Sequence, residues 1–445
     1  MTLDFAHDSV GRLFRQMFFP ILVGMVSMVV LNITDGAFVG HGVGSDALAA
    51  VNIVAPLFML TGGLGLMFGI GSSVVASIHL SQGNTHAANA NLTQGILCSV
   101  LCGLVLGALV FLFQPQVCLL FGCSQRLIPL ACSYLRWIAL LTPFNMFGMT
   151  AMFMVRLEGS PRFCMFINCA MALSNILLDW LFIFPLQWGL EGAAIATTTA
   201  FSLGNIPVLW YLFTQMHQVR LLPLRFTRAH VLRTLRNLWA QMKIGVSGLI
   251  GEVSIALVLI VGNYVFIRHL GEDGVAAYSV GCYCLPIVFM VGNAIVQSVQ
   301  PIISFAYGQQ QYPRLIQART IALGTAVLTG ATGMLILWLG SRAITTLFLP
   351  PDCHAHALCV QGLPLFSSAF LFIAINLTLI GYFQSIEAAR LATLFTVLRG
   401  IVFTLPSFLL LPLVLGHSGL WLALPAAEAT TTLLILLFAA FRRLR

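Results

Sequence analysis

Two aspartates, Asp35 and Asp179, stand inside long apolar stretches of this sequence. An ionised side chain in a lipid bilayer costs several kcal/mol, and such residues usually face a bundle interior or a water-filled path. Asn32 precedes Asp35 by three residues and Asn175 precedes Asp179 by four, so each amide is predicted to share a helix face with its acid. Thr197 adds a hydroxyl on the next apolar stretch.

These oxygen donors are predicted to lie at one depth in a membrane. Asp35 and Asp179 fall near the outer ends of their apolar segments, and Thr197 lies a similar distance into a segment that starts outside. At a rise of about 1.5 Å per residue, all three lie roughly 8–12 Å from the outer boundary. Such oxygens suit a hard cation, and two acids at one depth also favour uptake of a proton. The alternative is a hydrogen-bonded cluster that only fixes helix packing.

The elements that carry these residues are predicted to be transmembrane helices. The chain has 445 residues, of which 59% are hydrophobic and 8% are charged, whereas a soluble domain carries about 25% charged residues. Twelve apolar segments are long enough to span a bilayer and do not alternate as barrel strands do. They are approximately residues 14–38, 48–80, 92–113, 132–155, 163–185, 189–213, 244–266, 275–306, 316–339, 358–383, 391–415 and 419–441. The predicted fold class is an all-α membrane protein.

Positive charge gathers on alternate connecting segments. With the N-terminus inside, the inner segments hold most of the arginines, and the outer loops hold Arg126, Arg268 and Arg342. This bias predicts that both termini are cytoplasmic. The net charge of +8 then requires no nucleic-acid partner, because the basic segments face anionic membrane lipids.

The two halves of the sequence resemble each other in one register, in which GSDALAA at 44–50 matches GEDGVAA at 271–277. Six spans in each half give both halves the same orientation, and parallel repeats of this kind are typical of transporters. The prediction is therefore twelve transmembrane helices in two pseudo-symmetric six-helix lobes. The lobes are residues 1–214 and 243–445, and residues 215–242 form a basic cytoplasmic linker.

The second half lacks the acidic set, since Asp35 and Asp179 correspond in this register to Gly262 and Pro406. Its own buried charges are predicted to be Glu252, Arg399 and Glu428. The last two are expected to form a structural ion pair across neighbouring spans, because buried acids are usually paired. The first has no obvious cation near it and is a candidate functional residue.

Two local motifs carry less weight. Cys353, His354, His356 and Cys359 are possible metal ligands at short spacing, but we expect an outer loop that merely contains them, and no metal site. The sequence GVSG at 245–248 resembles the GxSG of intramembrane serine proteases, a chemistry that needs a base beside the serine. No histidine falls in the middle of a predicted span, which argues against the protease, and no HExxH or P-loop motif appears, which argues against a zinc protease or an ATP-driven pump. We therefore expect no catalytic residue and no cofactor. A membrane-embedded enzyme is the remote alternative.

Residues 175–198 (NILLDWLFIFPLQWGLEGAAIATT) and 425–433 (PAAEATTTL) resemble the MATE (multidrug and toxic compound extrusion) transporters. The closest likeness is to the bacterial branch with DNA-damage-inducible and staphylococcal-type multidrug pumps. The resemblance implies a monomeric antiporter in the bacterial inner (plasma) membrane. It would export lipophilic or cationic drugs in exchange for Na⁺ or H⁺.

The resemblance also assigns residues. It implies a cation site in the amino-terminal lobe formed by Asp35, Asn175, Asp179 and Thr197. It implies a helix bend at Pro20 and matches Glu252 to a glutamate of the carboxy-terminal lobe. Residues 372–381 (FIAINLTLIG) lack the aspartate that some relatives carry in the tenth span, which favours the amino-terminal site. The alternative within transport is a lipid-linked oligosaccharide flippase of the same superfamily, which should hold pyrophosphate with basic residues.

Overall fold

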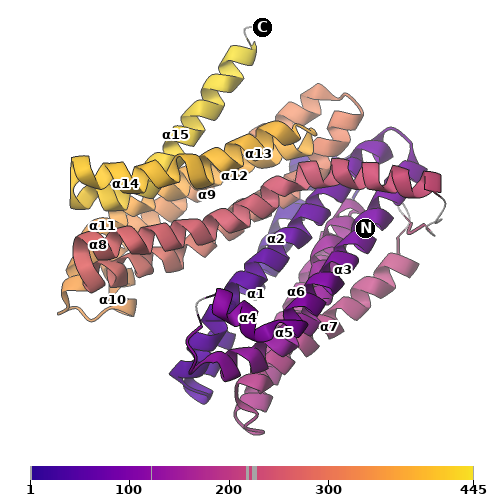
Figure 1. The fold of residues 1–445 in the computed structure, drawn as a ribbon. Coiled ribbons are helices and arrows are strands. Elements are labelled where there is room, and N and C mark those ends of the chain that lie inside the picture. The colour runs from indigo at the N-terminus through magenta and orange to yellow at the C-terminus, as the bar shows by residue number, and fades with distance from the viewer. Residues whose placement is uncertain (1–2, 122, 217–219, 223–227, 444–445) are drawn as a thin grey trace. The chain divides into compact units, whose positions relative to one another are not determined.

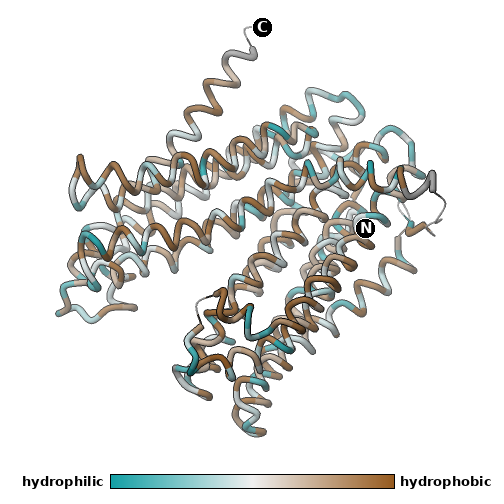
Figure 2. Tube along the Cα trace, viewed as in Figure 1, coloured by the Kyte–Doolittle hydropathy of each residue, from teal (hydrophilic) through white to brown (hydrophobic). Residues whose placement is uncertain are grey.

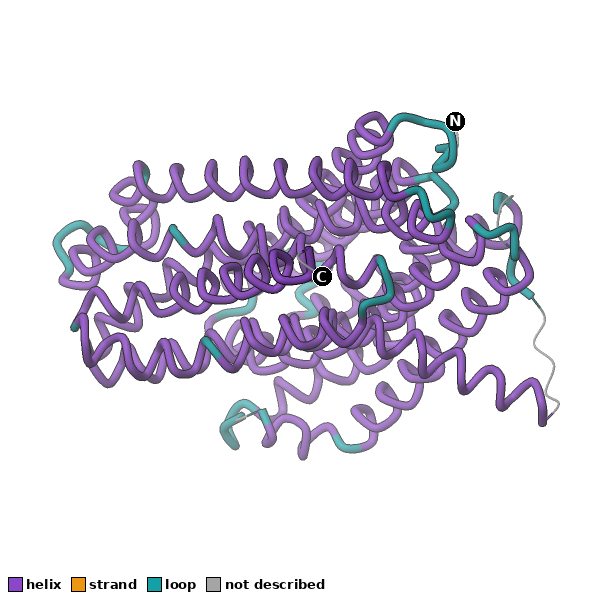
Figure 3. Tube along the Cα trace, turned by 90° about the horizontal axis from the view of Figure 1, so that it is seen from above, coloured by secondary structure: helices purple, strands orange, loops and turns teal. Residues whose placement is uncertain are grey.

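The computed structural model describes residues 3–121, 123–216, 220–222 and 228–443. These residues form helices joined by short loops and contain no strand (Figure 3). The first half contains α1 (Val10–Gly42), α2 (Ser45–Ser81), α3 (Thr85–Leu112), α4 (Gln114–Leu120), α5 (Ile128–Leu157), α6 (Pro161–Ile183) and α7 (Gly189–Thr214). The second contains α8 (Arg228–Gly308), α9 (Tyr312–Leu339), α10 (Ser341–Phe348), α11 (His354–Ser367), α12 (Ala369–Ser385), α13 (Ala389–Val397), the π-helix η1 (Leu398–Val402), α14 (Thr404–Leu415) and α15 (His417–Arg443).

Among the described residues, eleven helical segments are long and apolar enough to cross a membrane. Hydrophobic residues run along most of each long helix, and hydrophilic residues gather near ends and turns (Figure 2). Large apolar side chains are exposed on these helices, including Leu104, Val105 and Phe213. Such faces are unfavourable in water, whereas in a bilayer they face a solvent as apolar as themselves. The prediction of an all-α multi-pass membrane protein is therefore confirmed.

The longest segment, α8, consists of two helices that meet at Gly271. This glycine has φ 65° and ψ −156°, which lies outside the helical region. Glycine adopts a positive φ without the steric cost that a side chain would bring. The 81 residues of α8 are therefore not one continuous helix.

Two predicted spans are each divided into shorter helices, although the sequence is apolar throughout both spans. Residues 358–383 fall on α11 and α12, which meet at Ser368. Residues 391–415 fall on α13, η1 and α14. In η1 the amide of Phe403 donates to the carbonyl of Leu398 over 2.8 Å, the five-residue spacing of a π-turn.

One local prediction is wrong. The residues from His354 onward do not lie in a loop but begin α11. His356 is buried and its Nε2 lies 3.1 Å from the hydroxyl of Thr346. Cys359 is also buried and accepts a hydrogen bond from Thr345. These contacts use the side chains in packing, and the described part of the chain contains no group of three or more metal-ligating side chains.

The chain divides into two compact units. The first comprises Met1–Leu249 together with Ser304–Gln311, and the second comprises Ile250–Ile303 with Tyr312–Arg445. In the first unit, α1 packs against α6, and α7 packs against both α6 and α5 (Figure 1). The ring of Phe5, near the N-terminus, lies 6.1 Å from that of Phe305 in the late segment of the same unit.

In the second unit, α12 packs against α9 and α15, and α15 packs against α14. The side chains of Phe383, Phe395 and Ile435 form a buried apolar cluster there. The repeat in the sequence defines lobes by chain order, whereas these units are defined by compactness. Part of the predicted linker, at 217–219 and 223–227, lies outside the described residues.

Candidate cation site

Three helices of the first unit, α1, α6 and α7, bring the predicted polar side chains to one end of the bundle. Asp35 lies seven residues before the end of α1, and Asp179 lies four residues before the end of α6. Thr197 lies eight residues after the start of α7. At about 1.5 Å per residue, these positions lie roughly 6–12 Å inside the helix ends. The three residues therefore lie at similar distances from the ends of their helices.

The two carboxyl groups interact with each other. Asp35 and Asp179 lie close enough for direct electrostatic contact. The side chain of Asp179 is fully buried and that of Asp35 is half-buried. Two carboxylates repel each other strongly where little water screens them, so the pair is unfavourable unless a cation or a proton joins it.

The amide and the hydroxyl form the neighbouring part of the cluster. Asn175 Nδ2 donates to Thr197 Oγ1 over 3.2 Å, and that hydroxyl donates to the carbonyl of Ala193 over 3.1 Å. Asn175 is fully buried, and Thr197 is nearly so. The first of these bonds turns the amide oxygen of Asn175 away from the hydroxyl and leaves it free to accept.

Several oxygen atoms of this cluster lack a hydrogen-bond partner among the described residues. They are Asp35 Oδ1, both carboxylate oxygens of Asp179 and Asn175 Oδ1, and all are buried. A buried polar atom without a partner costs about 1–3 kcal/mol, and more when it is charged. Unpartnered hard oxygens from two neighbouring helices fit a small cation, or a proton shared between the acids.

Sequence reasoning missed a fourth element of this cluster. Tyr134, on α5, is almost fully buried and lies within electrostatic range of both Asp35 and Asp179. It belongs to the apolar cluster that also contains Leu190 and Ala193 of α7. Its place in the sequence gives no signal, because a tyrosine in an apolar helix is an ordinary packing residue.

Two other predicted residues lie elsewhere. Asn32 is exposed, so the structure does not bring it into the buried cluster with Asp35. Pro20 is buried within α1, which runs as one helix from Val10 to Gly42. Proline has no amide hydrogen, so the helix lacks one backbone hydrogen bond at this point.

The second unit contains a different polar cluster. Arg399 Nη2 and Nε lie 2.8 Å and 3.0 Å from Glu428 Oε1, and both side chains are buried. Asn376 Nδ2 donates to Glu428 Oε2 over 2.7 Å, and Asn376 Oδ1 accepts a bond from Thr432 Oγ1 over 2.8 Å. The guanidinium also lies 5.3 Å from the ring centre of Phe289. The expected ion pair is therefore present, and its acid is held by two partners.

The π-helix η1 positions this ion pair. It contains Arg399, whose carbonyl accepts a bond from Thr404 Oγ1 over 2.6 Å. The next residue, Gly400, lies directly against Ser254, where a Cβ would have no room. Glu252, two residues before that serine, is half-buried and has no ion-pair partner in the described part of the chain.

The sequence profile of a family named MatE matches residues 20–181 and 249–409, which is more than two thirds of the chain. The chain belongs to the MATE family. Its members are multidrug export transporters rather than enzymes, and the resemblance predicted from residues 175–198 and 425–433 is thereby confirmed.

The chain is similar to curated relatives over nearly its whole length. It is 21% identical to the multidrug export protein MepA of Staphylococcus haemolyticus (strain JCSC1435) over 430 residues, 97% of this chain and 93% of the relative. It is 22% identical to MepA of Staphylococcus aureus (strain MRSA252) over 425 residues, 95% of this chain and 92% of the relative.

Solved structures share the fold. An outward-facing multidrug resistance MATE transporter superposes with a TM-score of 0.90 at 19% identity, covering 99% of this chain and 98% of that one. MATE structures in a straight and a bent conformation superpose with TM-scores of 0.90 and 0.89, at 19% and 18% identity and the same coverage. The fold of this chain is therefore the MATE fold.

Proposed function

We propose that this MATE protein is a secondary active multidrug efflux transporter, which exports lipophilic or cationic compounds in exchange for Na⁺ or H⁺. The coupling ion binds at Asp35 and Asp179, with Asn175 and Thr197 as further ligands. The observation that carries this proposal is the pair of adjacent acids whose buried oxygens have no partner among the described residues. The names of the MepA relatives support drug export.

Ion binding drives export only if ion and drug oppose each other. A ligand shifts the balance between inward-open and outward-open states through its different affinity for the two states, and the coupling between two ligands is reciprocal. Neutralising the repulsion between Asp35 and Asp179 favours a state in which α1 lies closer to α6. A bend of α1 at Pro20, where a backbone hydrogen bond is missing, lets the outer part of this helix move toward α6 when the ion binds.

The proposed architecture has twelve spans, because α8 contributes one on each side of Gly271. Residues 1–214 and 243–445 form the two pseudo-symmetric lobes, and residues 215–242 form the linker. The protein is a monomer in the bacterial inner membrane, with both termini in the cytoplasm. Arg233→Cys, placed at an exposed position in a cysteine-free background, should react with an impermeant thiol reagent only from the cytoplasmic side. Reaction from the outside would contradict the proposed orientation of the chain in the membrane.

The decisive experiment separates the two ions. The protein is reconstituted in vesicles, and export of a lipophilic cationic dye is driven by a Na⁺ gradient alone and then by a pH gradient alone. Dye should move under at least one gradient, and that gradient names the coupling ion. Absence of movement under both gradients, in protein that is folded and correctly inserted, would contradict ion-coupled export.

A further inference from the structure

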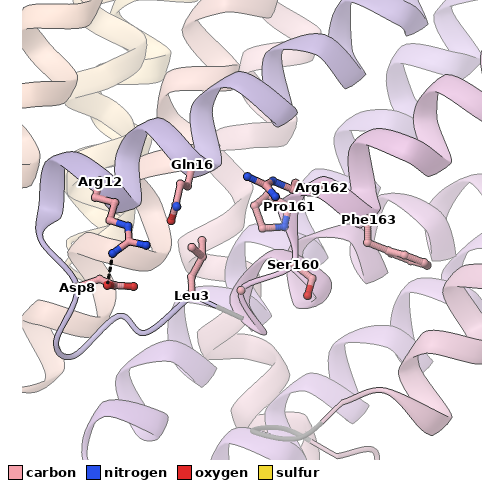
Figure 4. A pocket seen from close by; sticks show the side chains of 9 residues that line it. Leu3, Asp8, Arg12, Gln16, Ser160, Pro161, Arg162 and Phe163 are labelled. Carbon is pink, nitrogen blue, oxygen red and sulfur yellow. Dashed lines mark ion pairs between the residues drawn. The ribbon is translucent and has the colours of Figure 1, made fainter. Parts of the chain in front are cut away.

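Two adjoining cavities lie at the end of the first unit opposite the acidic cluster. One has a volume of about 380 Å³ and lies between the start of α1 and the start of α6 (Figure 4). A second, also about 380 Å³, shares Arg12, Gln16 and Arg162 with it and extends to Arg15, Phe19 and Pro20. Each is within the range of about 300–1,000 Å³ typical of small-molecule sites.

The polar lining is strongly basic. Three arginines border the cavities, and the one acid among the lining residues is Asp8. Asp8 lies 3.6 Å from Arg12, so this pair is internally compensated. Arg15 and Arg162 are exposed and have no ion-pair partner in the described ranges. Two uncompensated positive charges therefore remain for a ligand, and the N–H donors of Arg12 that do not face Asp8 can join them.

The backbone adds to this positive field. Arg162 lies in the first turn of α6, which contains no acidic residue, and Pro161 occupies the start of the helix. The N-terminus of a helix carries a partial positive charge that favours anions. Figure 4 shows Arg12 and Gln16 on α1 across from Pro161 and Arg162 on α6.

The other edge of the second cavity is apolar. Phe19 borders it and is 59% exposed, and Pro20 lies beside it. Phe19 lies on α1, which is long and apolar enough to cross a membrane, and an exposed ring on such a helix suits contact with hydrocarbon better than contact with water. A ligand that fits both edges carries an anionic group at one end and hydrocarbon at the other.

We propose that these cavities form a binding site for an anionic glycerophospholipid. Arg12, Arg15 and Arg162 contact the phosphate oxygens, which guanidinium groups bind in a bidentate manner. The acyl chains lie along Phe19. The exposed phenylalanine favours a lipid over a soluble phosphate ester, which would leave this ring without a contact. The proposed orientation of the chain places the site in the cytoplasmic leaflet, where anionic lipids attract basic residues.

Bound lipid has a consequence for α1. Its headgroup bridges the first turns of α1 and α6, the two helices that carry Asp35 and Asp179 near their other ends. The lipid therefore fixes the start of α1 below Pro20, while the outer part of the helix stays free to respond to the coupling ion.

The test measures lipid binding to the full-length purified protein. Phosphatidylglycerol is titrated in mixed micelles, and native mass spectrometry reports the bound fraction. Each arginine near a lipid phosphate contributes about a fivefold gain in affinity. The variant Arg12→Gln/Arg15→Gln/Arg162→Gln should therefore bind on the order of 100-fold more weakly. Zwitterionic phosphatidylcholine should bind more weakly than phosphatidylglycerol to the parent.

A matched variant controls for net charge. Arg233→Gln/Arg236→Gln/Arg390→Gln removes three charges from exposed residues outside the cavities and should bind like the parent. The double variant Arg15→Gln/Arg162→Gln keeps the Asp8–Arg12 pair, so folding is protected, and should lose about 30-fold. Parental affinity in this double variant, or an equal loss in the control, would overturn the site. Glycerol 3-phosphate that displaces the lipid at equal concentration would assign the site to a soluble anion instead.

Discussion

In the first compact unit a fully buried carboxyl group interacts with a half-buried one, whereas in the second a buried carboxylate is paired with a guanidinium. Asp35 and Asp179 have unpartnered oxygens among the described residues. Glu428 is bound by Arg399 through two nitrogens and by the amide of Asn376. Each cluster joins neighbouring helices within its own unit, and each lies in apolar surroundings.

The two clusters differ in whether the buried negative charge already has a positive partner. A buried ion pair with satisfied hydrogen bonds needs no further ligand, and removing one partner leaves an uncompensated charge. A buried acid pair is incomplete by itself, so it changes state whenever a cation or proton arrives. Neutralising one charged residue of the cluster should therefore have different consequences in the two units. In the first unit transport is lost, and in the second unit stability is lost.

The largest expected effect is the loss of export in Asp35→Asn. Replacing the charged ligand should slow gradient-driven dye export by about 100-fold, since a charge-assisted contact contributes up to about 3 kcal/mol. The melting temperature should equal or exceed that of the parent, because the repulsion with Asp179 is removed. Asp179→Asn should behave in the same way.

The control for this variant is Asp46→Asn. Asp46 lies near the start of α2, but it is exposed and pairs with Arg126 at the surface, where such pairs contribute about 0–1 kcal/mol. Export should stay at the parental rate. If Asp35→Asn exported dye as fast as the parent under both gradients, the acidic pair of the first unit would not be the coupling site.

The second effect concerns stability. Glu428→Gln or Arg399→Met should each destabilise the protein by about 3–5 kcal/mol, because a buried charge is left without its partner. The double variant should recover much of this loss. Thermal denaturation in detergent measures the change. A normal melting temperature together with abolished export in Glu428→Gln would assign the pair to transport rather than to folding.

A smaller effect is expected for Asn376→Leu. This amide donates to the side chain and to the carbonyl of Glu428, and a hydrogen bond to a charged group contributes about 1.5–3 kcal/mol. The melting temperature should fall by less than in Glu428→Gln. Asn32→Leu, at an exposed position of α1, is the matched control and should leave the melting temperature unchanged. Equal shifts in both variants would mean that the amide of Asn376 has no special role.

The smallest effect is expected for Thr197→Ala. Its hydroxyl is a neutral ligand that water can replace, so export should fall by about 2–10-fold. Thr198→Ala is the control, because that hydroxyl bonds to the carbonyls of Trp137 and Ala194 instead of Asn175. A loss as complete as that of Asp35→Asn would make the hydroxyl an essential ligand.

The sequence predicted the charged members of both clusters, and with them Asn175 and Thr197, but it did not indicate Tyr134 or Asn376. Asp35 and Asp179 are conspicuous because ionised residues are expensive in apolar segments. The pairing of Arg399 with Glu428 follows from the same cost. Tyr134 and Asn376 give no such signal, since neutral side chains are tolerated in helices whether or not they face a polar partner.

The sequence also predicted the spans better than their interruptions. Hydropathy depends on composition, which does not change at Ser368 or across η1, so residues 358–383 and 391–415 each read as one segment. These breaks depend on local hydrogen bonds such as that between Phe403 and Leu398. The error at Cys353–Cys359 has a related cause, because short spacing of polar residues is compatible with a loop or with the first turns of a helix.

The late segment Ser304–Gln311, which belongs to the first compact unit, has a consequence for biosynthesis. Phe5 leaves the ribosome about 300 residues before Phe305, the ring it contacts. At about 5–20 residues per second this interval is roughly 15–60 s. The first unit is thus not completed when its seventh helix has been translated. The contact between Phe5 and Phe305 can form only after most of α8 has been translated, so the N-terminal segment is synthesised long before the residue that it contacts.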